Sequence, residues 1–147
     1  MNRKWALITG AAGEIGKVLS NQLSERNCHL VLADHPAKME QLIALKERLE
    51  NQYQNHIITK TFDLNDIKQI KKSISELDDE VASVDFLINN AGINILQPAL
   101  DVKEDEWDAI LNVNVKGPFF LTQEIGRRMI NHGFGSIVFI SSQHGVV

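Results

Sequence analysis

The feature that most constrains the fold is a regular alternation between short apolar runs and longer segments in which apolar residues have helical spacing. The short runs are rich in Val, Ile, Leu and Phe and are nearly continuous; they span residues 5–9, 29–33, 57–62, 84–89 and 136–141. Strands covered by helices on both faces have this composition. The alternation therefore predicts an α/β fold with a doubly wound parallel sheet of about five strands.

The segments between these runs carry the apolar stripes of amphipathic helices. One stripe steps three or four residues at a time through Ile67, Ile70, Ile74, Leu77 and Val81, and a second passes through Leu42, Leu45 and Leu49. We expect Asn65 to cap the helix that carries the first stripe. A third helical stretch, 104–132, contains Gly117-Pro118 and ends before Gly133, a residue type common just past a helix.

Length and composition favour a single globular domain over residues 1–147. The chain is 44% hydrophobic and 23% charged, which excludes a disordered or fibrous protein. The net charge of −4 argues against a nucleic-acid partner, and no run approaches the roughly 18 apolar residues of a membrane span. The single cysteine, Cys28, suits a reducing compartment, so we expect a cytoplasmic protein.

A glycine-rich loop, residues 9–16 (Thr-Gly-Ala-Ala-Gly-Glu-Ile-Gly), follows the first predicted strand and opens the first predicted helix. This is the context that a dinucleotide-binding loop requires. Gly10 permits a sharp turn, Gly13 lets the backbone approach a phosphate, and Gly16 lets the helix pack on the strand. The helix N-terminus then offers N–H groups to a diphosphate. The loop predicts a Rossmann-type nucleotide site, with a structural turn as the alternative.

An acidic residue, Asp34, ends the second predicted strand. A carboxylate at this place accepts hydrogen bonds from the adenosine ribose hydroxyls, and its charge repels a 2′-phosphate. No arginine follows it, because His35 and Pro36 come next. The sequence therefore predicts NAD(H) rather than NADP(H) as the cofactor, with a plain strand-end turn as the alternative for Asp34.

Three further segments lie in order along the chain. Asn89-Asn90-Ala91-Gly92 ends the fourth predicted strand, residues 112–117 (Asn-Val-Asn-Val-Lys-Gly) lie in the third helical stretch, and residues 135–142 (Gly-Ser-Ile-Val-Phe-Ile-Ser-Ser) contain the fifth strand. Together with the glycine loop, they resemble the short-chain dehydrogenase/reductase family over essentially the whole sequence. The resemblance implies the N-terminal, cofactor-binding part of a nicotinamide-dependent oxidoreductase.

The resemblance also implies roles for individual residues. Cofactor contacts are expected at Gly10, Gly13, Glu14, Ile15, Gly16, Asp34, Asp63, Leu64, Asn90, Ala91 and Gly92. Asp63, followed by Leu64, corresponds to the residue that contacts adenine in the family. Ser142 corresponds to the serine that orients the substrate oxygen, and Asn114 to the helical asparagine whose carbonyl holds a water in a proton relay. The five histidines show no metal-ligand spacing, so no metal is expected.

Pro118 gives Asn114 a physical argument of its own. Proline has no N–H group, so the carbonyl of residue 114, four positions earlier, loses its helical partner. We expect the helix to bend there and Asn114 to keep a free acceptor. The alternative is a simple kink that water satisfies.

Two features depart from the family pattern. Glu14 stands where the family commonly has its middle glycine, and its carboxylate would repel the cofactor phosphates if it turned inward. The family's general acid/base is a tyrosine in a Tyr-x-x-x-Lys motif after the serine, but the only tyrosine is Tyr53, with Ile57 four residues later. A positioned acid/base is worth about 10²–10⁴-fold in rate, so we expect negligible turnover from the 147 residues alone. The chain stops soon after Ser142, which we interpret as truncation before the last strands and helices.

The first hypothesis is therefore an NAD(H)-dependent oxidoreductase that interconverts an alcohol, of sugar, polyol or acyl type, and a carbonyl in a small-molecule substrate. We expect a homo-oligomer whose interface includes the stretch 104–132. A second hypothesis is a catalytically inactive half-fold that binds nucleotide or a partner. A third is an S-adenosylmethionine-dependent methyltransferase, which shares the glycine loop and the acidic residue but does not account for residues 89–92 or 141–142.

Overall fold

The computed structural model describes residues 3–77, 81 and 83–142 of the chain. In this part of the chain, a five-stranded sheet has the order β3-β2-β1-β4-β5. The strands are β1 (Trp5–Thr9), β2 (His29–Asp34), β3 (Ile57–Thr61), β4 (Phe86–Asn89) and β5 (Ser136–Phe139). Every neighbouring pair is parallel, as the nearly continuous apolar runs predict.

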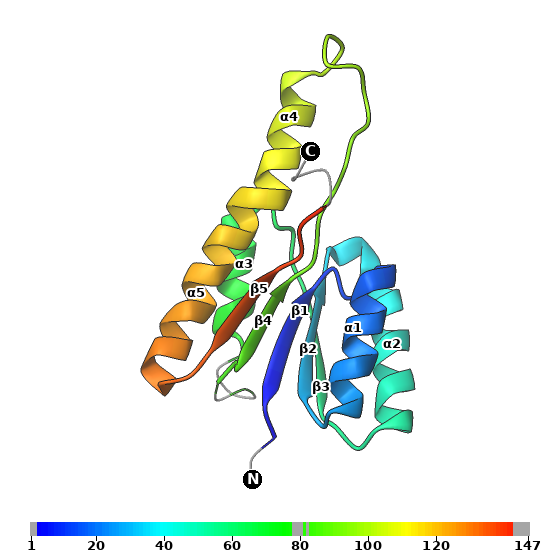
Figure 1. Cartoon of the computed structure of the whole chain (residues 1–147), viewed down its shortest axis with the longest axis vertical. Coiled ribbons are helices and arrows are strands. Elements are labelled where there is room, and N and C mark those ends of the chain that lie inside the picture. Colours follow the sequence, from blue (N-terminus) through cyan, green and yellow to red (C-terminus); the bar gives the residue numbers. More distant parts are fainter. Residues whose placement is uncertain (1–2, 78–80, 82, 143–147) are drawn as a thin grey trace.

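Helices cover both faces of the sheet (Figure 1). α1 (Glu14–Glu25) and α2 (Met39–Gln52) lie on one face, and α3 (Ile67–Ser75) and α5 (Gly117–His132) lie on the other. A 3₁₀ turn, η1 (Pro36–Lys38), leads into α2, and α4 (Glu104–Leu111) continues into α5 through η2 (Asn112–Lys116). This is the doubly wound arrangement that the sequence predicts.

Successive strand residues point into two separate apolar cores. Leu7 of β1 lies in the core beneath α3 and α5, together with Ile70 and Ile74 of the predicted stripe. Its neighbours Ala6 and Ile8 lie in the opposite core, which contains Leu42, Leu45 and Leu49 of α2. Because both faces of β1, β2 and β4 are buried, these strands show no polar alternation. β5, at the edge of the sheet, is exposed at all four of its residues.

One helix begins differently from the sequence-based expectation. Asp66, not Asn65, caps α3: its Oδ1 accepts hydrogen bonds from the N–H groups of Lys68 (2.9 Å) and Gln69 (3.2 Å). The expectation was wrong by one residue because Asn and Asp are equally good caps. Asn65 instead belongs to the preceding turn, where its N–H donates to Asp63 Oδ1 at 2.8 Å.

Three strands are shorter than the apolar runs that contain them, and the first of these, β3, ends at Thr61 rather than residue 62. β4 begins at Phe86 rather than residue 84. The Asp85 carboxylate accepts the hydrogen bond of the Trp5 N–H at 2.8 Å and takes the place of a strand carbonyl. β5 ends at Phe139, although the Ile140 N–H still donates to the Asn89 carbonyl at 2.8 Å.

The stretch from α4 to α5 contains the distortion that Pro118 predicts. In η2 the hydrogen bonding is π-helical, because the Gly117 N–H donates to the Asn112 carbonyl, five residues back. Single π turns of this kind are a known cause of helix bending. α5 ends before Gly133, whose φ of 80° is the left-handed value that favours glycine at this place. Residues 143–147, which follow Ser142, lie outside the described residues.

Candidate functional site

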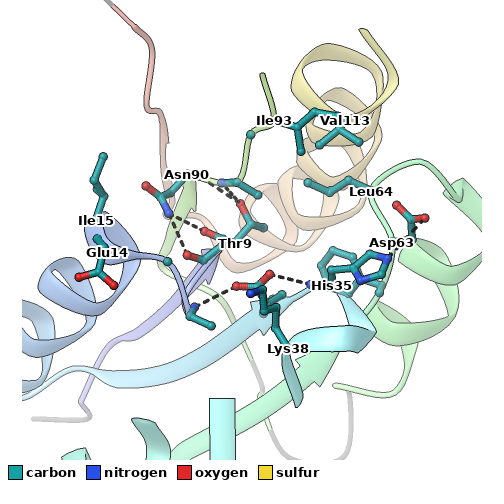
Figure 2. A pocket seen from close by; sticks show the side chains of 18 residues that line it. Thr9, Glu14, Ile15, His35, Lys38, Asp63, Leu64, Asn90, Ile93 and Val113 are labelled. Atoms are coloured by element: carbon teal, nitrogen blue, oxygen red, sulfur yellow. Dashed lines mark hydrogen bonds and ion pairs between the residues drawn. The ribbon is translucent and has the colours of Figure 1, made fainter. Parts of the chain in front are cut away.

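A pocket of about 510 Å³ lies at the carboxyl ends of β1, β2 and β4. The chain moves outward from β1 to β2 and β3, then returns to the other side of β1 to form β4. In open parallel sheets, ligands bind in the crevice at such a reversal. The pocket is lined by Thr9, Gly10, Ala12, Gly13, Glu14, Ile15, Ala33, Asp34, His35, Lys38, Phe62, Asp63, Leu64, Asn90, Ala91, Gly92, Ile93 and Val113 (Figure 2).

Thr9 and Asn90 join the ends of β1 and β4 beside the pocket. The Asn90 Nδ2 donates to the carbonyls of Thr9 (3.0 Å) and Gly10 (3.1 Å). The Thr9 Oγ1 accepts from the N–H groups of Asn90 (3.0 Å) and Ala91 (3.1 Å), and Figure 2 draws these bonds together. This network fixes the glycine loop relative to the turn that follows β4.

Two glycines of the loop are required by their surroundings. Gly10 has a φ of 62°, and a Cβ there would lie 2.8 Å from the Ala91 Cα. At Gly16 a Cβ would lie 2.1 Å from the Gly10 carbonyl oxygen. A left-handed φ and backbone contacts this short both exclude a side chain.

The N-terminus of α1 presents backbone N–H groups at the edge of the pocket. Earlier in the loop, the Ala12 N–H donates to Asp34 Oδ2 (2.9 Å) and the Gly13 N–H to the Gly10 carbonyl (3.1 Å). Gly13 is the N-cap, and no side chain caps the helix there. Of the first-turn N–H groups, those of Glu14 and Ile15, which line the pocket, can therefore serve a ligand, and a helix N-terminus favours an anionic one.

Glu14 is the first residue of α1 and lines this end of the pocket. Its side chain is 92% exposed, and its Oε1 lies 2.9 Å from Lys17 Nζ. The hydrogen bond from Lys17 and, next, the charge of Lys17 lower the pKa of the Glu14 carboxyl below its usual value. The group is therefore ionised at neutral pH and turned toward solvent.

Asp34 and Asp63 form the other side of the pocket. Asp34 Oδ2 accepts from the Ala12 N–H (2.9 Å), and its Oδ1 accepts from the His35 N–H (2.8 Å). Asp63 Oδ1 accepts from the Asn65 N–H (2.8 Å), and its Oδ2 lies 3.9 Å from His35 Nε2. Backbone donors thus hold both carboxylates as acceptors for hydroxyl or amino groups of a ligand.

Two basic side chains, His35 and Lys38, also line the pocket near Asp34. Lys38 comes to the pocket through the 3₁₀ turn η1, which begins two residues after β2 ends. Lys38 therefore supplies positive charge on this side of the pocket, although no arginine follows Asp34 directly.

Asn114 holds the segment after β4 against η2. Its Oδ1 accepts from the Ile93 N–H (2.9 Å), and its Nδ2 donates to the Ile93 carbonyl (2.8 Å). Gly92 lies next to this amide, since a Cβ there would be 3.4 Å from Asn114 Oδ1. Gly117 brings the start of α5 close to the loop after β3, because a Cβ there would be 2.3 Å from the Leu64 carbonyl oxygen. These contacts position the wall of the pocket formed by Ile93 and Leu64.

The structure gathers most of the predicted cofactor residues around one pocket. Gly10, Gly13, Glu14, Ile15, Asp34, Asp63, Leu64, Asn90, Ala91 and Gly92 all line it. Three predicted site residues do not line it: Gly16 packs under the loop, Asn114 bonds to Ile93, and Ser142 is exposed beyond β5.

Sequence reasoning did not single out several lining residues as site residues. They are Thr9, Ala12, Ala33, His35, Lys38, Phe62, Ile93 and Val113. All but Val113 lie at, or within four residues of, the carboxyl end of a strand. That position was the available signal, because the carboxyl ends of parallel strands meet at one edge of the sheet.

Among residues 3–77, 81 and 83–142, no cluster of three or more His, Cys, Asp or Glu side chains is placed to hold a metal ion. In the same part of the chain, no helix is both long and apolar enough to cross a membrane. Cys28 is buried, and burial raises the pKa of its thiol. A raised pKa disfavours the reactive thiolate.

Comparison with known proteins gives a family and a set of relatives. The family model described as short chain dehydrogenase matches residues 4–147. NAD-dependent glycerol dehydrogenase of Listeria innocua is 33% identical over 144 residues, which cover 98% of this chain and 54% of that protein. The 2-dehydro-3-deoxy-D-gluconate 5-dehydrogenase of Bacillus subtilis is 34% identical over 140 residues, covering 95% of this chain and 53% of that protein.

Solved structures agree with the sequence comparison. A metagenomic short-chain oxidoreductase in complex with NADP matches with a TM-score of 0.88 at 28% identity, covering 95% of this chain and 62% of that one. The chain spans about half the length of the curated relatives it matches.

Proposed function

The chain belongs to the short chain dehydrogenase family, and from that premise we propose that residues 1–147 are the dinucleotide-binding domain of a cytoplasmic oxidoreductase. The proposed reaction interconverts an alcohol and a carbonyl by hydride transfer with NAD(H). The observation that carries the proposal is the pocket at the β1–β4 reversal, where a helix N-terminus without a capping side chain and two carboxylates face one cavity. Family membership removes the methyltransferase hypothesis.

The pocket residues would divide the dinucleotide among them. The N–H groups of Glu14 and Ile15 would hold the diphosphate, Asp34 the adenosine ribose hydroxyls, and Asp63 with Leu64 the adenine. Asn90 would act by fixing the loop, because its side-chain donors already bond the carbonyls at the end of β1. When bound, the nicotinamide ring supplies or accepts the hydride.

Asp34 supports NAD(H) over NADP(H), because its carboxylate would repel a 2′-phosphate. The charge of Lys38 acts against this preference, and a related structure contains NADP. We give Asp34 the greater weight because two backbone N–H groups hold its oxygens, at 2.9 and 2.8 Å. A lysine side chain must instead lose rotamer freedom to hold a phosphate.

Calorimetric titration of the 147-residue chain with NADH and with NADPH tests this proposal. We expect NADH to bind at least about tenfold more tightly at low salt. The ratio should fall toward one in Asp34→Asn, whereas Lys38→Gln should weaken NADPH more than NADH. Equal affinities in the wild type would contradict the NAD(H) preference, and the absence of binding by either nucleotide would contradict the proposed function.

We propose that Ser142 and Asn114 take part in catalysis in a protein that also contains a general acid/base. The Ser142 hydroxyl would donate a hydrogen bond to the substrate oxygen, and the Asn114 carbonyl would hold a water. Tyr53 does not fit the acid/base role, because it follows α2 and precedes β3, at the end of the sheet opposite the pocket. We therefore expect the 147 residues alone to bind dinucleotide but to turn over at least about 10²-fold more slowly than a relative with a positioned tyrosine.

Polyols and sugar acids are the proposed substrate class, following the glycerol and deoxygluconate named in two relatives. The formation of NADH from NAD⁺ with a panel of these compounds measures turnover. A rate for the 147-residue chain that matches those relatives would contradict the proposed need for a further acid/base.

A second copy of the chain is the proposed partner of the α4–η2–α5 arm. Trp107, Leu111, Val115 and Phe119 are four residues apart and are 59%, 42%, 59% and 57% exposed. Two arms packed antiparallel around a twofold axis would bury this apolar stripe against itself.

Sedimentation equilibrium tests this partner. We expect the wild type to be a dimer or larger, and Val115→Asp to shift it toward the monomer, because a charge in the stripe would be buried unpaired. Val18→Asp on α1 is the matched control, since Val18 is 58% exposed but lies on the other face of the sheet. A monomeric wild type, or an equal effect of both substitutions, would contradict the proposed interface.

A further inference from the structure

An ion pair stands at the start of α1, beside the pocket. Glu14 lines the pocket, and Lys17, one helical turn later, approaches it to 2.9 Å. The two side chains are 92% and 42% exposed, for Glu14 and Lys17 respectively. An exposed pair with this i,i+3 spacing contributes little to stability and rearranges at small cost.

The same helix end is the part of the pocket suited to an anion. The first-turn N–H groups have no capping side chain, because the N-cap is Gly13. The helix dipole favours negative charge there, whether it comes from Glu14 or from a bound phosphate. The Glu14 carboxylate and an anionic ligand therefore compete for the positive end of the α1 helix dipole.

The other charged groups of the pocket lie on its opposite side. His35, Lys38 and Asp63 come from the ends of β2 and β3 and from η1, across the pocket from Glu14 in Figure 2. Asp34, at the end of β2, accepts a hydrogen bond from the Ala12 N–H at 2.9 Å. The carboxylates of Asp34 and Asp63 line the pocket together with Lys38, so the positive charge of Lys38 is offset there. On the α1 side, Glu14 is the ionisable lining residue, and Lys17 is its cationic neighbour.

We propose that Glu14 and Lys17 set the affinity of this pocket for a diphosphate: Glu14 weakens binding, and Lys17 strengthens it by turning from Glu14 toward the bound phosphates. This inference rests on the proposed function, because its ligand is the diphosphate of the dinucleotide. A purely structural role for Glu14 would stabilise the start of α1 and leave nucleotide affinity unchanged.

Calorimetry with three probes separates these roles. NADH and ADP carry a diphosphate, whereas adenosine has the same adenine and ribose without charge. The variants are Glu14→Gln, Lys17→Gln and the double variant. Glu124→Gln is the control for loss of a helical ion pair away from the site, because Glu124 forms an i,i+3 pair with Arg127 at 3.0 Å on α5, and neither residue lines the pocket.

One unit charge beside a diphosphate in a solvated site predicts effects of roughly 3–10-fold. Glu14→Gln should tighten NADH and ADP by that factor, and Lys17→Gln should weaken them by a similar one. The double variant should fall between the two single variants. Adenosine affinity should stay constant throughout, and the Glu14 effect should shrink at high salt, where the Debye length falls to about 3 Å at 1 M.

Two results would overturn the inference in different ways. If the wild type binds NADH and Glu14→Gln changes its affinity by no more than Glu124→Gln does, Glu14 has only a structural role and the proposed function stands. An equal gain for adenosine and ADP would likewise overturn it. If neither the wild type nor Glu14→Gln binds NADH or ADP, the proposed function itself fails, and the inference fails with it.

Discussion

The two ends of the sheet are built from the same strands but have different chemistry. At the carboxyl end, backbone N–H groups, carboxylates and glycines surround a pocket. At the amino end, the rings of Trp5, His29 and His56 pack together in tilted and edge-on pairs, with centroids 5.0 Å apart for Trp5–His29 and 5.5 Å for Trp5–His56. The His29 Nδ1 also accepts a hydrogen bond from the His56 N–H at 2.8 Å.

The difference follows from the direction of parallel strands. β1 to β4 each lead from their carboxyl ends toward the N-terminus of a helix, where N–H groups lack helical partners. β2 to β5 each follow the C-terminal end of a helix, where no such donors are available. The carboxyl end therefore suits an anionic ligand, and the amino end is free to be closed by side-chain packing. Substitutions at the carboxyl end should therefore change ligand binding, whereas substitutions at the amino end should change stability alone.

The largest effect is expected at Gly16. Gly16→Ala would place a Cβ 2.1 Å from the Gly10 carbonyl oxygen, so the loop or the helix must move. We expect a loss of about 3 kcal/mol in the free energy of unfolding, together with loss of NADH binding. Urea unfolding and calorimetry measure the two quantities.

Gly126→Ala is the matched control for this substitution. A Cβ at Gly126, in the middle of α5, would meet nothing within 4 Å. Alanine should raise helix stability there by up to about 1 kcal/mol and leave NADH affinity unchanged. Similar losses from both glycine substitutions would contradict the proposed role of the loop.

A smaller effect is expected at Thr9, which joins β1 to β4. Thr9→Val removes the Oγ1 that accepts from the N–H groups of Asn90 and Ala91. Leaving these donors unpaired should cost about 1–3 kcal/mol of stability and weaken NADH binding by loosening the pocket. Thr59→Val, at a half-buried position of β3, should change neither. Unaltered NADH binding in a destabilised Thr9→Val protein would show that the junction is structural only.

At the amino end of the sheet, we expect His29 to make the free energy of unfolding depend on pH. We expect it to have no effect on ligand binding. Burial, followed by the charges of Arg3 and His56, lowers the pKa of His29 from its ordinary value of 6.5. The folded state therefore takes up this proton less readily than the unfolded state. Neutral His29 therefore makes its full contribution to the free energy of unfolding above about pH 6.5. This contribution is lost as the pH falls from there toward the pKa of His29 in the folded state.

Urea unfolding at pH 7.5 and 5.5 in the wild type and His29→Asn checks this sign. The variant should lose less stability than the wild type on acidification, while NADH affinity at pH 7.5 should be the same in both proteins. An identical loss in the two proteins would mean that His29 does not carry the pH dependence.

The smallest effect is expected at the start of α3. Asp66→Ala removes the acceptor for the N–H groups of Lys68 and Gln69, so it should lower stability slightly, whereas Asn65→Ala should not. The cap hydrogen bonds, the one from Gln69 foremost, also lower the pKa of the Asp66 carboxyl. NMR titration of that carboxyl would test the assignment independently, and an unshifted pKa would contradict it.

The parts of the fold that could be predicted have local causes. The stripe Leu42, Leu45 and Leu49 faces the core because helical spacing alone places it on one face. Gly10 and Gly16 could be assigned because a strand-to-helix turn of this length needs glycine at those places. Pro118 predicted a helix distortion because it has no N–H group.

The parts that could not be predicted depend on contacts between distant segments. Asn114 meets Ile93 only because η2 packs beside the segment after β4. The π-helical form of η2 depends on a one-residue shift in hydrogen bonding, which composition does not encode. Lys38 lines the pocket because of the path of η1. Each of these three features shapes the candidate site more than it shapes the fold.

The central claim is that the carboxyl end of the sheet binds a dinucleotide. The most direct measurement is a backbone amide NMR titration of the 147-residue chain with NADH. The account predicts saturable shifts of the amides of Gly13, Ile15, Asp34 and Gly92, while those of His29 and His56 at the amino end stay unchanged. Shifts confined to the amino end, or none at saturating NADH, would contradict it.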